Sequence, residues 1–500
     1  MRVWLIVLFF CLPISCARRE PPAPPILPAG ELSQRSLLPA DPYADARRAL
    51  AERAAARERR FREAYEPGSM WRWLRVEQAD IDAGRIQGQA LLDIGRALFA
   101  VDFTPEQGLG NGLAQRKSRL AGPRPAPNLR HVQYKEFGGP DGTRCLSCHH
   151  VGGDGGGGFR SDNSFLDGDG ERPASALERN PRAIVGAAII QKLAEEMTAE
   201  LRQQLDRVRR FGGASTAVPL VAKGISFGTL RLDRAGRVDP SAISGVDADL
   251  VVRPFGWKGD TATLREAVEQ ALQKNLGVQP ERWINDPRIR SDTARVGDGP
   301  RANDPDHDGV VREATDGMVT ALVTYLASLA PPIEAMPEDP SFLLRASRGA
   351  ELFEQIGCAG CHVPELPLDS TVVELGPRPG SGRVDLAPLL TAPGQPRRAR
   401  TVRLYSDLRR HDMGDSLAEP RPYRGVSGRL WLTPPLWGIA ASGPYMHDGR
   451  ATNLDAAILA HDGEGRAARE AYSKLHFEDQ GALNLFLTVL DRPHHMEFRR

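Results

Sequence analysis

The sequence predicts a mainly helical protein with two domains of similar kind, long loops and few strands. The motif Cys-x-x-Cys-His occurs twice, at residues 145–149 and 358–362. Each copy follows an amphipathic segment, and the two segments end in the related pentapeptides Gly95-Arg-Ala-Leu-Phe99 and Gly349-Ala-Glu-Leu-Phe353. The 500 residues are 41% hydrophobic, which is enough for two or three ordinary domains with room for a buried cofactor.

The chain begins with the pattern of an export signal. Met1-Arg2 precede an apolar run from Val3 to Leu12, which is too short to span a bilayer. Pro13-Ile14-Ser15-Cys16 then resembles a bacterial lipoprotein processing site, although Pro13 stands where leucine is usual. We expect a signal peptide at 1–16 and an exported, periplasmic protein. Lipidation of Cys16, which would anchor it to the membrane, and simple cleavage nearby remain alternatives.

Composition divides the rest of the chain into four segments. Residues 17–42 are rich in Pro, Ala and Arg and predict a disordered tether. Ala, Arg and Glu at helical spacing over 43–66 predict a long helix in an N-terminal extension, residues 43–70. We expect a first domain at 71–330 and a second at 341–492.

Periodicity predicts the elements inside these domains. Helices are expected at 181–210, 261–275, 315–329, 453–461 and 478–490. The best strand candidate runs from Leu220 to Leu232, and a Pro- and Gly-rich loop runs from Gly376 to Pro396. Pro331, Pro332, Pro337 and Pro340 predict a linker between the domains.

The two repeated motifs carry the chemistry. Four of the six cysteines belong to them, namely Cys145, Cys148, Cys358 and Cys361, and the other two lie in the export signal. Two thiols at this spacing can add to the two vinyl groups of one haem, and the following histidine, His149 or His362, then binds the iron. The sequence therefore predicts two covalently bound haem c groups in two cytochrome c-like haem domains.

Two other interpretations of the motifs remain as alternatives. A zinc site would need four ligands gathered from both motifs, and a thioredoxin-type redox pair needs no histidine after the second cysteine.

Two loops offer weaker signals. Gly152 to Gly158 is nearly all glycine, which suits either close backbone approach to a cofactor or a flexible turn. Asp304, Asp306 and Asp308 alternate as in a calcium loop, but no Glu stands at the twelfth position. A calcium ion and a solvated acidic turn remain alternatives there.

Four further segments resemble signatures of the di-haem oxidoreductase family, which is related to bacterial di-haem cytochrome c peroxidases. They are Asp249-Leu-Val-Val-Arg-Pro-Phe-Gly-Trp-Lys258, Leu404-Tyr-Ser-Asp-Leu-Arg-Arg-His-Asp-Met-Gly414, Thr433-Pro-Pro-Leu-Trp-Gly438 and Gly443-Pro-Tyr-Met-His447-Asp-Gly-Arg450. The resemblance covers residues 90–491 and implies a peroxidase-like enzyme with two haems.

The resemblance implies a second axial ligand for haem II, the haem of the second motif. In the related peroxidases this ligand lies fourteen residues after the histidine of the His-Asp-Gly motif, usually as Met, and here that position is His461. Independently, the spacing of Leu454, Ala457, Ile458 and His461 places them on one helix face. A core histidine is the alternative role for His461, and Met413 and His447 are the alternative ligands. An iron with two histidine ligands has no open site and suits electron transfer.

Haem I, the haem of the first motif, lacks a comparable ligand. Residues 151–180 contain no histidine, and His150 is too close to His149 to reach the opposite face of the iron. We therefore expect an iron that is open, or closed only by water or a mobile side chain, where peroxide or dioxygen would bind.

No catalytic side chain is assigned, and Trp257, Lys258 and Glu266 are candidates. O–O cleavage needs a proton-transferring group and a cation or dipole, which Lys258, Arg265, Glu266 and Glu269 could supply, although such residues are commonly exposed helix charges. Trp257 resembles the tryptophan that relatives hold between the haems, where an indole could relay an electron; core packing is the alternative.

Three functions are compatible with these features. The first is a peroxidase in which haem I activates hydrogen peroxide and haem II supplies electrons from a small redox protein or an organic donor. The second is a dioxygen-using enzyme of the di-haem rubber-oxygenase type, and the third is an electron carrier without a substrate. Because 65 basic residues balance 64 acidic ones, no nucleic-acid partner is expected.

Overall fold

The computed structural model describes residues 69–110, 132–134, 139–211, 217–233, 235–285, 309–332, 334, 339–378, 380–390 and 401–490. The chain divides into two compact units, residues 1–67 and 68–500, and all of the described residues belong to the second unit. The predicted signal peptide, Cys16, the tether, the helix at 43–66 and the aspartates Asp304, Asp306 and Asp308 lie outside the described residues.

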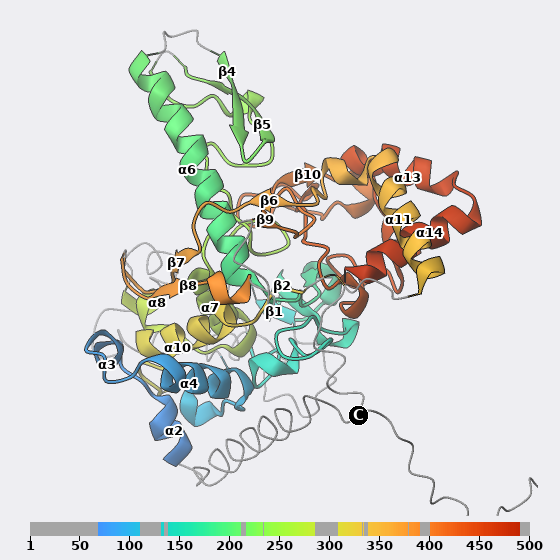
Figure 1. Cartoon of the computed structure of the whole chain (residues 1–500). Coiled ribbons are helices and arrows are strands. Elements are labelled where there is room, and N and C mark those ends of the chain that lie inside the picture. Colours follow the sequence, from blue (N-terminus) through green and yellow to red (C-terminus); the bar gives the residue numbers. More distant parts are fainter. Residues whose placement is uncertain are drawn as a thin grey trace, which may run out of the picture. The chain divides into compact units, whose positions relative to one another are not determined.

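The described part of the chain is mainly helical with short strands, as the sequence predicts (Figure 1). The larger helices are α4 (Gly88–Ala100), α6 (Ala187–Phe211), α7 (Leu264–Ala271), α10 (Asp316–Ala327), α11 (Pro340–Gln355), α13 (Arg466–Ser473) and α14 (Phe477–Val489). Shorter helices are α2 (Ser69–Leu74), α3 (Gln78–Asp82), α8 (Glu281–Asn285) and α12 (Leu454–Leu459).

Within the part of the chain that the structure describes, the strands form one small sheet and four two-stranded pairs. In the sheet, β1 (Val132–Tyr134) pairs in parallel with β2 (Ser164–Gly168), which pairs antiparallel with β3 (Leu177–Arg179). The antiparallel pairs are β4 (Ala217–Ala222) with β5 (Ile225–Arg231), β6 (Leu366–Pro367) with β9 (Thr401–Val402), β7 (Val372–Glu374) with β8 (Arg383–Asp385), and β10 (Arg410–Asp412) with β11 (Leu430–Leu432).

The internal repeat corresponds to two close helix pairs, α4 with α10 and α11 with α14. At Gly95 of α4, a Cβ atom would lie 2.0 Å from the carbonyl oxygen of Ala321 in α10. At Gly349 of α11, a Cβ atom would lie 2.1 Å from the carbonyl oxygen of Ala482 in α14. Each helix that precedes a Cys-x-x-Cys-His motif therefore uses glycine at the same repeat position to let a later helix approach closely.

The five predicted helices are confirmed with shifted ends. The first begins at Ala187, after Gly186 with its φ of +69°, and the second continues from α7 into a π-helical turn at Leu272–Leu276. Helices α10, α12 and α14 match the other three.

Three predictions of local structure are wrong. The single strand from Leu220 to Leu232 is a hairpin, β4–β5, because Lys223 and Gly224 both have positive φ, 50° and 79°, as a tight hairpin turn requires. The loop from Gly376 to Pro396 contains strand β8. Pro340 belongs to α11 and not to the linker, since its fixed φ suits the first helical turn, which Asp339 caps.

Two clusters of buried apolar side chains form the core. One is built mainly by α4, α6, α7 and α10, and the other by α11 and α14 with Tyr405 and Tyr472. The first cluster also includes Leu366, Leu404 and Leu408 from the predicted second domain. The domain limits 71–330 and 341–492 therefore stay a prediction. Within the described residues, we find no helix with the length and apolar character needed to cross a bilayer.

Candidate functional site

The two Cys-x-x-Cys-His motifs have the same local structure. The first begins a short 3-10 helix at Cys145–Ser147 and the second at Cys358–Gly360. The backbone N–H of His149 donates to the carbonyl of Cys145 at 3.1 Å, and that of His362 donates to Cys358 at 3.0 Å. This turn brings both thiols and the following histidine to one place, in each motif.

All four cysteines of the two motifs are partly buried. Burial raises the pKa of Cys145 to about 12 and that of Cys358 to about 11, so both stay protonated at neutral pH. Among the described residues, the only cluster of three potential metal ligands is Cys361, Asp407 and His411, so the two motifs do not gather into one four-ligand zinc site.

Both motif histidines have their Nδ1 atoms held by backbone carbonyls. His149 Nδ1 lies 3.2 Å from the oxygen of Gly156 and 3.1 Å from that of Arg182, whereas His362 Nδ1 lies 3.1 Å from the oxygen of Tyr405. A ring that donates from Nδ1 presents the Nε2 lone pair. Burial lowers the pKa of His149, and lowers that of His362 to about 4, so both rings are neutral and able to bind a metal.

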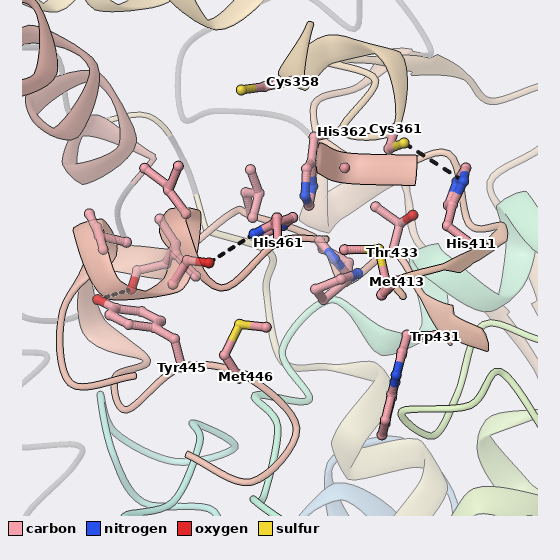
Figure 2. A pocket seen from close by; sticks show the side chains of 18 of the residues that line it. Cys358, Cys361, His362, His411, Met413, Trp431, Thr433, Tyr445, Met446 and His461 are labelled. Atoms are coloured by element: carbon pink, nitrogen blue, oxygen red, sulfur yellow. Dashed lines mark hydrogen bonds between the residues drawn. The ribbon is translucent and has the colours of Figure 1, made fainter. Parts of the chain in front are cut away.

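A cavity of about 360 Å³ lies beside the second motif, and Cys358, Cys361 and His362 line it. The predicted helix face also lines it, namely Leu454, Ala457, Ile458 and His461. His461 stands just beyond the end of α12, and its Nδ1 lies 2.8 Å from the carbonyl oxygen of Ala457. Figure 2 shows His362 and His461 reaching into the cavity from different segments of the chain.

The pair of imidazoles fits a haem iron between them. The ring centroids of His362 and His461 are 6.4 Å apart, and no described group bonds to either Nε2. A separation of this size could accommodate a metal ion between the two rings, since metal–imidazole bonds are about 2 Å long. The remaining lining is largely apolar, including Phe353, Leu436 and Leu487, as a haem requires.

The two alternative ligands also line this cavity, Met413 and His447. The imidazole of His447 is stacked on the indole of Trp431, with ring centroids 4.0 Å apart and planes at 23°. Burial lowers the pKa of His447 to about 4. The ring of His447 therefore packs face to face on an indole, whereas the ring of His461 meets the ring of His362 edge-on.

The Gly-rich loop, residues 152–158, lies beside the first motif, on the side that the Nδ1 atom of His149 faces. Val151 and Gly157 pair as an isolated bridge, and Gly156 supplies one of the carbonyls that face His149. The loop is therefore an ordered turn that positions the histidine. Among the described residues, no second imidazole pairs with His149 in the way that His461 pairs with His362.

The candidate catalytic residues lie in different places. Trp257 lines the cavity, and its indole N–H donates to the carbonyl of Asn180 at 2.8 Å. Lys258 is completely buried and Glu266 lies in the first turn of α7, and neither lines the cavity.

Three of the charged candidates are buried, in contrast to the exposed helix charges that the sequence suggests. The exposed fractions are 0% for Lys258, 5% for Arg265 and 0% for Glu269. Glu269 pairs with Arg282 at 2.7 Å and with Arg265 at 3.7 Å.

The segment 180–182 connects the surroundings of the two motifs. Its first residue, Asn180, is buried, and its backbone N–H donates to the carbonyl of His447 at 2.6 Å. Two residues further, the carbonyl of Arg182 faces His149. This three-residue segment therefore joins a contact to the first motif with a contact to the wall of the second cavity.

Sequence reasoning missed Asn180, His411 and Trp431. His411 and Trp431 lie on the paired strands β10 and β11 and line the cavity. His411 is part of a segment that resembles a family signature, which is the only signal that could have drawn attention to it. The partners of His411 are Asp407, four residues before it, and Glu464, 53 residues after it.

The fold and the two sites define a mainly helical protein with two haem-binding motifs. The family described as "Di-haem oxidoreductase, putative peroxidase" matches residues 239–490, about half of the chain, and the chain belongs to this family. It is therefore a haem-containing oxidoreductase of the peroxidase-like type.

The solved structures that match the chain share little sequence with it. Hydrazine synthase from Kuenenia stuttgartiensis has 14% identity over 84% of this chain and 92% of its own, with a TM-score of 0.33. A MauG-like protein associated with microbial copper homeostasis has 15% identity over 83% and 92%, with a TM-score of 0.35. A variant of the di-haem peroxidase BthA from Burkholderia thailandensis has 15% identity over 84% and 90%, with a TM-score of 0.34. No curated protein matches the chain significantly.

Proposed function

We propose that hydrogen peroxide reacts at the haem of the first motif and that the haem of the second motif transfers electrons. This division of roles between the two haems rests on one observation. His461 pairs with His362 across the second cavity, with ring centroids 6.4 Å apart. Two imidazoles on one iron leave no position for peroxide. The described surroundings of His149 contain no such second imidazole, and we propose that this iron is open, or closed only by water or a mobile side chain.

Both haems would be attached covalently. Cys145 with Cys148, and Cys358 with Cys361, lie on matching turns, and each thiol can form one thioether bond to a haem vinyl group. A haem bound at each motif supplies an iron that accepts and releases single electrons. His149 and His362 would bind the two irons through Nε2, with their orientation fixed by the carbonyls that face Nδ1.

The reaction consumes two electrons, because one hydrogen peroxide, two electrons and two protons give two water molecules. We propose that Trp257 relays electrons between the two sites. It lines the second cavity and donates to Asn180, two residues from the carbonyl of Arg182 that faces His149. The electrons would come from a small redox protein or an organic donor.

Three further proposals rest on sequence alone. The export signal supports a periplasmic location, Cys16 supports a lipid anchor, and Asp304, Asp306 and Asp308 support a calcium ion.

Electron paramagnetic resonance of the haem-loaded protein, with and without hydrogen peroxide, tests the division of roles. We expect one high-spin and one low-spin ferric signal, both changed by peroxide. Two low-spin signals that peroxide leaves unchanged would contradict the proposal and favour an electron carrier.

A further inference from the structure

Lys258 places a buried positive charge directly on the ring of Trp431. Its Nζ atom lies 3.4 Å from the ring centroid, and the residue is completely buried. Nζ donates to the carbonyls of Gly428 at 2.8 Å and Leu430 at 3.0 Å, which fix the ammonium group over the indole. A third hydrogen bond, to the carbonyl of Ser427 at 3.3 Å, also holds the ammonium group at the ring.

The charges around this ring sum to a positive value. The carboxylate of Glu419 lies 3.2 Å from Lys258 Nζ, but it also accepts two hydrogen bonds from Arg179. The guanidinium carbon of Arg179 is itself 5.4 Å from the centroid of the Trp431 ring. Two cations and one anion therefore surround an indole that is 6% exposed, and solvent screening of the excess charge is weak.

Trp431 lies where an oxidising equivalent could reach it. It lines the same cavity as Trp257, and the backbone N–H of its neighbour Leu432 donates to the carbonyl of Trp257 at 3.0 Å. Its other face is stacked on His447. On position alone, Trp431 and Trp257 are two competing electron donors to a haem in this cavity.

We propose that Lys258 acts as an electrostatic guard that prevents the oxidation of Trp431 and so directs electron transfer to Trp257. An indole that loses one electron becomes a cation, and a fixed ammonium at 3.4 Å repels that cation. Trp257 is less affected, because its nearest ring-facing cation, Arg182, is 5.2 Å from the ring. This inference rests on the proposed peroxide reaction and gives Lys258 an electrostatic role in place of proton transfer.

Removing the charge should turn Trp431 into a site of oxidative damage. In that step the indole gains one oxygen atom from hydrogen peroxide, and the peroxide leaves as water. The variant K258M retains an unbranched apolar side chain of similar length but carries no charge, and K258R retains a cation. K274M is the matched control, since Lys274 also lies over a neighbouring ring, with Nζ 5.0 Å from the centroid of Tyr423.

The experiment exposes the haem-loaded variants to hydrogen peroxide and measures the oxygen-containing Trp431 peptide by mass spectrometry. We expect K258M to show about tenfold more oxidised Trp431 than wild type or more, with K258R and K274M close to wild type. K258Q takes the place of K258M if the latter does not fold. Equal modification of Trp431 in wild type and the uncharged variant overturns the inference.

A second oxidant separates this inference from the proposed function. Hexachloroiridate(IV) removes single electrons without peroxide, and the same order of Trp431 modification is expected with it. Two iridium(IV) ions then take one electron each from the indole, and water supplies the oxygen atom and releases two protons. If peroxide changes neither haem spectrum, the proposed function fails, while the comparison with hexachloroiridate(IV) still decides the role of Lys258.

Discussion

The imidazole of His411 bridges two carboxylates, with Nε2 2.8 Å from Asp407 and Nδ1 2.7 Å from Glu464. Glu464 lies in the 3-10 turn Gly463–Gly465, which directly follows the segment that holds His461. His411 lies on β10, so this bridge ties that strand to the turn after His461. The position of the candidate ligand thus depends on an ion pair outside its own helix.

This bridge predicts a pH-dependent stability. Burial lowers the pKa of His411, but the hydrogen bonds and charges of Asp407 and Cys361 together outweigh burial, and the pKa is raised from 6.5 to about 11. A raised pKa means that the charged ring contributes its full stability below pH 6.5 and loses it as the pH rises towards 11. At pH 6, H411Q should lower the free energy of unfolding by about 2 kcal/mol, and this difference should shrink by about pH 10.

Denaturant unfolding of the haem-loaded protein at several pH values measures this difference. E464Q tests the second half of the bridge, and because the carboxylate of Glu464 is 48% exposed, its removal should cost less than about 1 kcal/mol. A difference between wild type and H411Q that stays constant from pH 6 to about pH 10 would show that His411 is not charged.

Replacement of His461 should change the spin state of one haem. In H461A we expect the low-spin ferric signal of the second haem to become high-spin while both haems stay attached, since His362 and the two cysteines are untouched. Absorption and electron paramagnetic resonance spectra measure this change. H447A should stay low-spin, because the ring of His447 is stacked on Trp431. An unchanged spectrum of H461A would move the ligand to Met413 or His447.

Removal of the first pair of thiols should separate the two haem roles. The double variant C145S/C148S is expected to lose one of the two haems and all peroxide turnover, while the second haem keeps its low-spin spectrum. Haem content by pyridine haemochrome assay and peroxide consumption provide the readouts. Peroxide turnover that survives in this variant would place the reactive iron at the second motif.

The features predictable from sequence were those set by neighbours in the chain. The two motifs fix their own turns, and the helix face that ends in His461 follows from a 3.6-residue period over a few residues. The hairpin of β4 and β5 was missed because apolar residues stand on both sides of Lys223-Gly224, and the positive φ angles of that pair reveal the turn.

The charge clusters could not be predicted for a different reason. The burial of Lys258 depends on Glu419 and on three carbonyls between Ser427 and Leu430, which the chain brings to it from far away. Arg265 and Glu269 are one helical turn apart, and their spacing suggests an ordinary surface pair. Their burial follows from the packing of α7 against α10, which no local pattern encodes.

The close contact at Gly349 predicts a large effect from a single methyl group. In G349A the new Cβ would stand 2.1 Å from the carbonyl oxygen of Ala482, so α11 and α14 must move apart. Because Phe353 on α11 and Leu483 and Leu487 on α14 line the haem cavity, we expect the free energy of unfolding to fall by about 2 kcal/mol or more. G360A is the matched control, since a Cβ there meets no atom within 4 Å, and it should lie within about 0.5 kcal/mol of wild type. Thermal or denaturant unfolding compares the two, and equal stability of G349A and G360A would show that the helices do not pack through this glycine.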